Sequence, residues 1–125
     1  MANFNELEGK TLTEVSVVDG FGGEEKIVFK TLEGDTFTMK HFQDCCECVY
    51  IEDICGDLSD LIGQRIEVAE ERGGDVNRNE YGEIQAYTFY TIRTVKGTVD
   101  IRWNGSSNGY YSIGVAFVTD DEDYY

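Results

Sequence analysis

The chain has 125 residues, with 25 acidic side chains against 10 lysines and arginines, which gives a formal net charge of −15. This length is typical of one folded domain, and a hydrophobic content of 41% excludes global disorder. So strong a negative charge repels nucleic acids and anionic membranes and favours a protein partner with a basic surface. We therefore expect no direct nucleic-acid binding and no membrane binding; an acidic surface without a charged partner is the alternative.

No run of about 18 apolar residues is present, so the sequence predicts no transmembrane helix. The first residues are acidic and polar, unlike a signal peptide, and we expect a cytoplasmic protein. In that compartment the four cysteines are expected to be thiols, and a disulfide between the adjacent Cys45 and Cys46 is disfavoured because its ring would be strained.

Residues 1–9 are interpreted as a lead-in, and β-strands are predicted from alternating, β-branched segments separated by turn residues. The predicted strands are 11–18, 26–31, 35–40, 46–51, 65–71, 84–95, 98–103 and a last strand over 111–117. The clearest pair is a hairpin around Gly34, which places Ile27, Phe29, Phe37 and Met39 on the core side. The longest strand, 84–95, is apolar on both sides and should be central.

One short helix is predicted near 57–63, where Asp57 can cap the first turn, Asp60 suits the helix dipole and Gly63 ends the helix. Residues 72–83 are interpreted as a mobile loop, 104–109 as a glycine-rich turn and 119–125 as an acidic tail. The expected fold is α+β but mostly β, an antiparallel sandwich or partly closed barrel of about eight strands in a single domain, 1–125.

The stretch from His41 to Asp57 contains the only histidine and all four cysteines. A zinc site here would use His41, Cys45, Cys46 and Cys55. No Cys-x-x-Cys spacing supports that site, and adjacent cysteines in a strand point to opposite faces. The alternative is that Cys46, Cys48 and Cys55 are small buried hydrophobic residues. A nucleophilic cysteine beside His41 is disfavoured, because the many acids nearby raise the pKa of a thiol.

The same stretch is acidic, and no basic residue occurs between Lys40 and Arg65. It lacks the Asp-x-Asp-x-Asp-Gly spacing of a calcium loop, so we interpret it as a contact surface instead. The expected partner-binding residues are Asp44, Glu47, Glu52, Asp53, Asp57, Asp60 and Tyr110. Tyrosine is included because it is enriched at interaction hot spots. Rows of carboxylates can also imitate DNA phosphates, which lie about one per 1.7 Å of duplex axis.

The run His41–Gly63, with the pattern HxQDCCExVxIEDIxGDLxDLIG, resembles the signature of an uncharacterised domain family found in phages and prophages. The runs TFYxxxT at 88–94, KGxVxIRW at 96–103 and SNGYYS at 107–112 are similar to the C-terminal half of that family. Cys48 departs from the small polar residue usual at its position, which argues against a ligand role for it. The resemblance transfers no activity, and it implies a small accessory protein of phage type in the cytoplasm of the host cell.

These observations lead to a non-enzymatic binding protein, a monomer or homodimer, that engages and inhibits a host nucleic-acid-handling or defence protein through its acidic surface. One alternative is a metal-binding domain whose His/Cys site has a structural or redox role. Another is a structural or virion-associated module. Salt-sensitive binding, bound metal and presence in purified particles, respectively, distinguish the three hypotheses.

Overall fold

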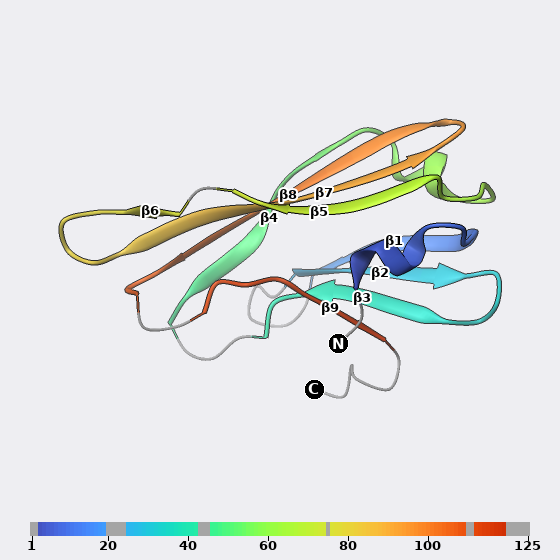
Figure 1. Cartoon of the computed structure of the whole chain (residues 1–125). Helices are drawn as coiled ribbons and strands as arrows, with labels where there is room; N and C mark the ends of the chain where they lie inside the picture. The colour runs from blue at the N-terminus through green and yellow to red at the C-terminus, as the bar shows by residue number, and fades with distance from the viewer. Residues whose placement is uncertain (1–2, 20–24, 43–45, 75, 110–111, 120–125) are drawn as a thin grey trace.

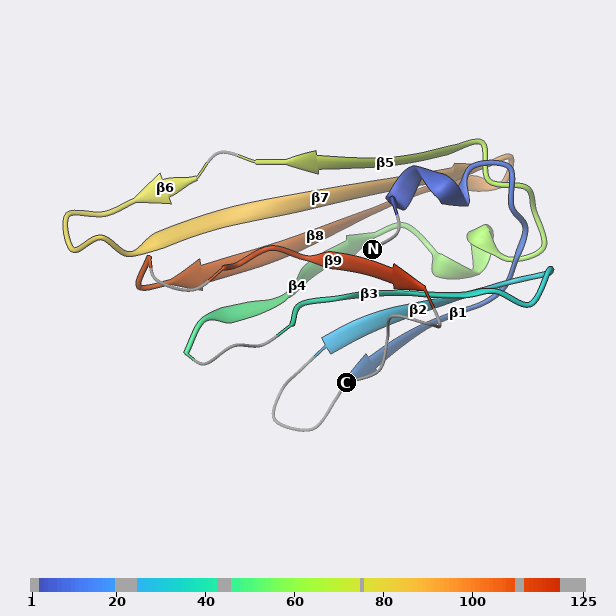
Figure 2. The same ribbon diagram turned by 60° about the horizontal axis from the view of Figure 1, so that its bottom comes forward.

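A computed structural model describes residues 3–19, 25–42, 46–74, 76–109 and 112–119. They form two antiparallel sheets stacked face to face (Figures 1 and 2). The strand order is β1-β2-β3-β9 in the first sheet and β4-β8-β7-β5 in the second, where β6 also pairs with β7. The predicted antiparallel, mostly β sandwich is confirmed, and the sheets do not close into a barrel.

The first sheet contains β1 (Leu12–Asp19), β2 (Glu25–Thr31), β3 (Thr36–Lys40) and β9 (Ala116–Thr119). The second contains β4 (Cys48–Cys55), β5 (Val68–Gly73), β6 (Asn77–Arg78), β7 (Ile84–Thr94) and β8 (Gly97–Ser107). Two single turns of 3₁₀ helix complete the described fold, η1 (Phe4–Leu7) and η3 (Leu58–Leu61). The short helix expected near 57–63 is the second of these turns, and Asp57 caps it by accepting the Ser59 amide at 3.0 Å.

The core lies between the sheets and follows the alternation of the predicted hairpin. Ile27, Phe29, Phe37 and Met39 are all buried, as the sequence predicts. Trp103 on the facing sheet donates its indole N–H to the Met39 sulfur at 3.0 Å. Because this contact joins β8 to β3, it fixes how the two sheets lie against each other.

Part of the segment interpreted as a lead-in contributes to this core. The η1 turn places Phe4 and Leu7 among the buried side chains. The Phe4 ring lies 4.7 Å from the Tyr90 ring and 5.2 Å from the Phe117 ring, centroid to centroid. This turn therefore fills the space between β7 and β9, as Figure 2 shows for its position beside β5.

Two segments whose sequences indicate irregular structure contain strands instead. Within 72–83, the first two residues belong to β5, β6 pairs with β7, and Asn79 to Glu83 closes a turn whose backbone hydrogen bond measures 3.0 Å. Within 104–109, β8 continues to Ser107. The resulting β6–β7 arm extends beyond the first sheet (Figure 1).

The strand predicted over 65–71 starts later than expected. β5 begins at Val68, and Ile66 precedes it as a buried side chain. Alternation from Ile66 would also bury Val68, but the next buried position is Ala69 and Val68 is only half-buried. The reason is the local pairing, because the Ile66 carbonyl and amide bond Gly9 and Lys10 before β5 joins β7.

Candidate functional site

His41 and Glu47 form a buried pair at the point where the chain leaves the first sheet for the second. The imidazole Nε2 lies 2.7 Å from the Glu47 carboxylate, and the two side chains are 6% and 0% exposed. The other ring nitrogen, Nδ1, lies 2.6 Å from the Gly114 carbonyl. A carbonyl can only accept, so Nδ1 carries a hydrogen and donates it. The pair therefore ties the end of β3, the start of β4 and the segment before β9 together.

This arrangement does not fit the zinc site considered from the sequence. Both nitrogens of His41 are engaged, and a metal ligand needs a free nitrogen lone pair. Cys45 lies outside the described residues, and Cys55 is at the far end of β4. Within the described ranges, no group of three or more histidines, cysteines or acids could hold a metal ion.

The cysteines differ from both expectations made for them. Cys46, Cys48 and Cys55 are exposed rather than buried, so they are not core residues. Cys48 and Cys55 are free thiols, whereas Cys46 is disulfide-bonded, which corrects the expectation of four thiols. The partner of Cys46 lies outside the described residues, and so does the disfavoured bond between Cys45 and Cys46.

At Cys55, the thiol donates to the Asp53 carboxylate at 3.2 Å. This hydrogen bond, followed by the charge of the same carboxylate, raises the pKa of the Cys55 thiol. We expect Asp53→Asn to increase the alkylation rate of Cys55 several-fold near pH 8, because more of the thiol then ionises. Iodoacetamide labelling followed by mass spectrometry measures the rate, and Cys48 in the same chain serves as the reference. An unchanged Cys55 rate would contradict the assigned role of Asp53.

The predicted contact residues do not form one continuous surface. Asp44 and Tyr110 lie outside the described residues, and Glu47 is buried against His41. Asp60 is half-buried, and its backbone carbonyl accepts the Thr94 hydroxyl at 2.7 Å. Glu52, Asp53 and Asp57 remain exposed at the C-terminal end of β4.

A fourth carboxylate joins these three from the neighbouring strand. Asp100 on β8 lies opposite Cys55, and it accepts the Thr91 hydroxyl at 2.6 Å. We call Glu52, Asp53, Asp57 and Asp100 the β4 acidic face. Sequence reasoning missed Asp100, because its alternation shows only that it points outward and not which strand lies beside it.

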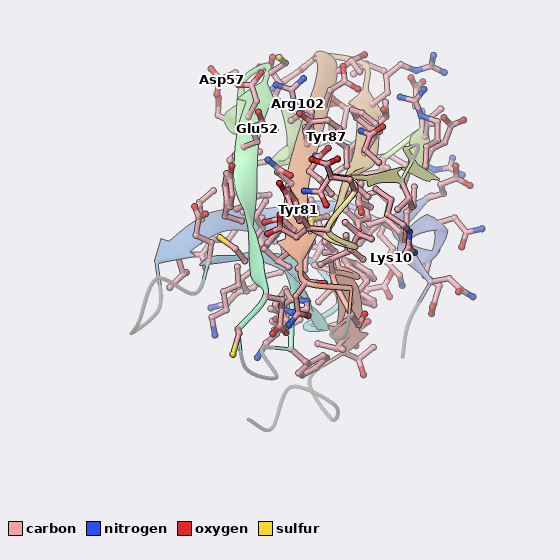
Figure 3. The ribbon with its side chains drawn as sticks, turned by 90° about the vertical axis from the view of Figure 1, so that its left-hand side faces the viewer. Lys10, Glu52, Asp57, Tyr81, Tyr87 and Arg102 are labelled. Carbon is pink, nitrogen blue, oxygen red and sulfur yellow. The ribbon has the colours of Figure 1, made fainter. Side chains whose placement is uncertain are left out.

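The β4 acidic face also includes a base that the sequence places far away. Arg102 on β8 lies opposite Asp53, and its Nε is 3.7 Å from the Glu52 carboxylate (Figure 3). Its guanidinium lies 5.4 Å from the centre of the Tyr87 ring. Together with Arg72, it borders a small hollow of about 190 Å³ that Asp53 and Asp100 also line. The sequence stretch from Lys40 to Arg65 contains no lysine or arginine between its ends, but in the fold two arginines from other strands border this acidic surface.

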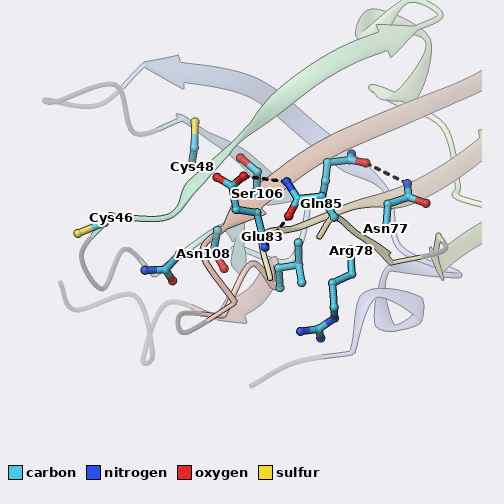
Figure 4. Close-up of a pocket in the computed structure, with 11 residues that line it drawn as sticks. Cys46, Cys48, Asn77, Arg78, Glu83, Gln85, Ser106 and Asn108 are labelled. Carbon is cyan, nitrogen blue, oxygen red and sulfur yellow. Dashed lines mark hydrogen bonds between the residues drawn. The ribbon is translucent and has the colours of Figure 1, made fainter. Parts of the chain in front are cut away.

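Beyond this face, a chain of polar side chains crosses the outer surface of the second sheet. Asn104 donates to the Tyr50 hydroxyl at 3.0 Å, and Gln85 donates to Asn104 at 2.8 Å. Asn77 then donates to Gln85 at 3.2 Å. These residues come from β4, β8, β7 and β6. The chain of hydrogen bonds holds the arm to the sheet, and its Asn77 and Gln85 line a pocket of about 560 Å³ (Figure 4).

The tip of the arm displays an aromatic side chain on a well-supported turn. Tyr81 is 80% exposed, which makes it the most exposed of the large hydrophobic residues described. The Asn79 side chain accepts the amides of Tyr81 and Glu83 at 2.9 and 3.0 Å, and it donates to the Glu83 carboxylate at 2.7 Å. These bonds hold the turn in one conformation.

The fold and these surfaces define a small acidic β-sandwich with open polar surfaces. The chain belongs to the family described as Domain of unknown function (DUF7448), which it matches over residues 5–117. The expected membership of an uncharacterised domain family is thereby confirmed. No curated protein and no solved structure matches the chain. Among the described residues, no helix is long and apolar enough to span a membrane.

Proposed function

We propose that this protein is a non-enzymatic binding protein that engages a basic surface of another protein through the β4 acidic face. The observation that supports the proposal is the gathering of four exposed carboxylates, three on the adjacent strands β4 and β8 and one at the start of η3, in a chain of net charge −15. The sheet provides a rigid base, so the carboxylates need little reordering when a partner binds. Complementary charge of this kind accelerates association and selects basic partners.

The resemblance to phage and prophage proteins suggests the class of partner. The partner we propose is a host protein that handles nucleic acid, such as a defence enzyme, in the cytoplasm of the host cell. The cleft of such an enzyme is basic because it binds phosphates, and carboxylates at strand spacing can occupy the same positions. Binding would then exclude DNA or RNA from the cleft and inhibit the enzyme.

The test compares two triple variants in a pulldown from host lysate followed by titration with the captured protein. Glu52→Gln/Asp53→Asn/Asp57→Asn changes the β4 acidic face, and Asn at position 57 can still cap η3. Glu33→Gln/Glu67→Gln/Glu80→Gln is the control, because it also removes three negative charges, at exposed positions outside the β4 acidic face. We expect the first variant to weaken binding on the order of tenfold, at about 0.5 kcal/mol for each charge, and the control to weaken it much less.

Salt dependence provides the second measurement. Raising the ionic strength from about 0.05 to 0.3 M should weaken binding on the order of tenfold, because screening shortens the range of the charges. Equal effects of the two triple variants would assign the binding to net charge alone. Salt-insensitive binding, or no captured protein, would overturn the proposal.

A further inference from the structure

β5 is the edge strand of the second sheet, at the edge opposite β4. In an antiparallel pair, alternate residues direct their backbone groups toward the neighbouring strand. The Gly74 amide donates to the Tyr87 carbonyl on β7, so the even-numbered residues of β5 direct their backbone amides and carbonyls toward β7. Ala69, Glu71 and Gly73 therefore direct their amides and carbonyls away from the sheet.

Only the beginning of this edge is covered. The Glu8 carboxylate accepts the Ala69 amide at 3.1 Å, and the pairing of Ile66 with Gly9 and Lys10 precedes it. From the Ala69 carbonyl onward, the outward backbone groups of Glu71 and Gly73 have no partner within the described part of the chain. An edge of this kind is a template for an additional strand.

A groove of about 610 Å³ runs along this open edge, between β5 and η1. Among the described residues that line it, Glu8, Glu70 and Glu71 are acidic and Arg72 is basic. Burial raises the pKa of Glu71, so its charged form is poorly solvated and a nearby cation would stabilise it.

The wall of the groove hides a polar group without a partner. Tyr90 is fully buried, and its hydroxyl forms no hydrogen bond within the described residues. It lies opposite Glu71 in the strand register, and its ring contacts Phe4, which also lines the groove. A donor or acceptor entering beside Glu71 could satisfy this hydroxyl, which is otherwise costly to bury.

We propose that the free edge of β5 binds an extended basic peptide, which adds a strand to the second sheet and places lysine or arginine side chains on the face of Glu71. Backbone hydrogen bonds to Glu71 and Gly73 supply the affinity, and the carboxylates select the charge. A second copy of the chain fits less well, because two such edges would bring like-charged glutamates together. β5 is at the opposite edge of the sheet from β4. Peptide binding at β5 and partner binding at the β4 acidic face are therefore separate proposals, and either can be wrong while the other holds.

The test is a fluorescence anisotropy titration with a labelled peptide of alternating lysine and valine, six residues long like β5. We expect saturable binding to the wild-type protein and a loss on the order of tenfold when alternate peptide amides are methylated, since these can no longer donate. The same peptide with glutamate in place of lysine should not bind. The methylated peptide tests the strand geometry without changing the protein.

Variants of the protein locate the site. Gly73→Pro removes one outward amide without affecting the bonds to β7, and a side chain at this position has open space. It should weaken binding on the order of tenfold, and Glu71→Gln should weaken it several-fold. The control variants, Glu33→Gln and the triple variant of the β4 acidic face, should bind as the wild type does.

Three results would overturn the proposal. The first is no anisotropy change with the wild-type protein. The second is that the methylated peptide binds as tightly as the unmethylated one and that Gly73→Pro binds as tightly as the wild type. That result would show only diffuse attraction between charges. The third is a dimer in analytical ultracentrifugation that Gly73→Pro converts to monomer, which would show that the edge is occupied by a second copy.

Discussion

Replacing Glu47 by alanine is expected to lower the free energy of unfolding by about 2 kcal/mol, because it leaves a shielded ring nitrogen of His41 without its hydrogen-bond partner. The Glu47 side chain is fully buried and bonds His41, which stays held at Gly114 by its other nitrogen. In Glu47→Ala, the imidazole Nε2 loses its partner, and the His41 side chain is only 6% exposed to solvent. Urea denaturation followed by tryptophan fluorescence measures the effect.

Two comparisons separate this pair from general effects of charge removal. Glu52→Ala removes an exposed carboxylate of β4, the strand that follows Glu47, and should cost less than about 1 kcal/mol. The double variant His41→Ala/Glu47→Ala should be destabilised by less than the sum of the two single variants, because the partners are coupled. A loss below about 1 kcal/mol for Glu47→Ala would show that the pair is not a stabilising link between the sheets.

Gly56→Ala is expected to lower the free energy of unfolding by about 3 kcal/mol, for two reasons that act together. Gly56 has a φ of +111°, a conformation that side chains disfavour. An added Cβ would also lie 2.5 Å from the Thr98 carbonyl oxygen and 3.1 Å from the Val99 Cα. Both contacts are with the backbone of β8, so relief requires moving a strand. Thermal and urea unfolding of the variant measure the loss.

Gly34→Ala is the matched control for this substitution. Gly34 has a similar φ of +95°, but nothing lies within 4 Å of an added Cβ. Its replacement should cost about 1 kcal/mol from backbone strain alone. The difference between the two variants then measures the contact with β8. Equal losses would show that this close approach contributes nothing to the preference for glycine.

Much of the fold could be predicted because alternation is a local property of the sequence. Ile27, Phe29, Phe37 and Met39 alternate on either side of a single glycine turn, and all four are buried. The central position of the longest strand is also predictable, since β7 has apolar residues on both sides and pairs with β8 and β5. Gly105 suggests a turn by its residue type, but it lies within β8. The close approach of Ile113 explains the glycine, because an added Cβ would lie 2.7 Å from the Ile113 side chain.

The candidate site was less predictable, since it depends on which strands become neighbours. Glu47 occurs in an acidic stretch that favours a surface position, yet it alternates in phase with Val49 and Ile51. That phase, together with a lone histidine six positions earlier, was the available signal for a buried pair. Asp100 and Arg102 could not be assigned to the site, because only the β4–β8 pairing brings them to it.

The β4–β8 pairing contains an irregularity between Ile51 and Asp53, and Glu52 is the residue without a counterpart on β8. Asp53 and Cys55 face solvent beyond this bulge, while Ile54 packs against the core. The strand would keep the same pattern if Glu52 were absent, with Ile51 inward, Asp53 outward and Ile54 inward. Glu52 is thus an insertion that the interior does not need. Variation by one residue at this position can add or remove a surface charge while the strands stay in register.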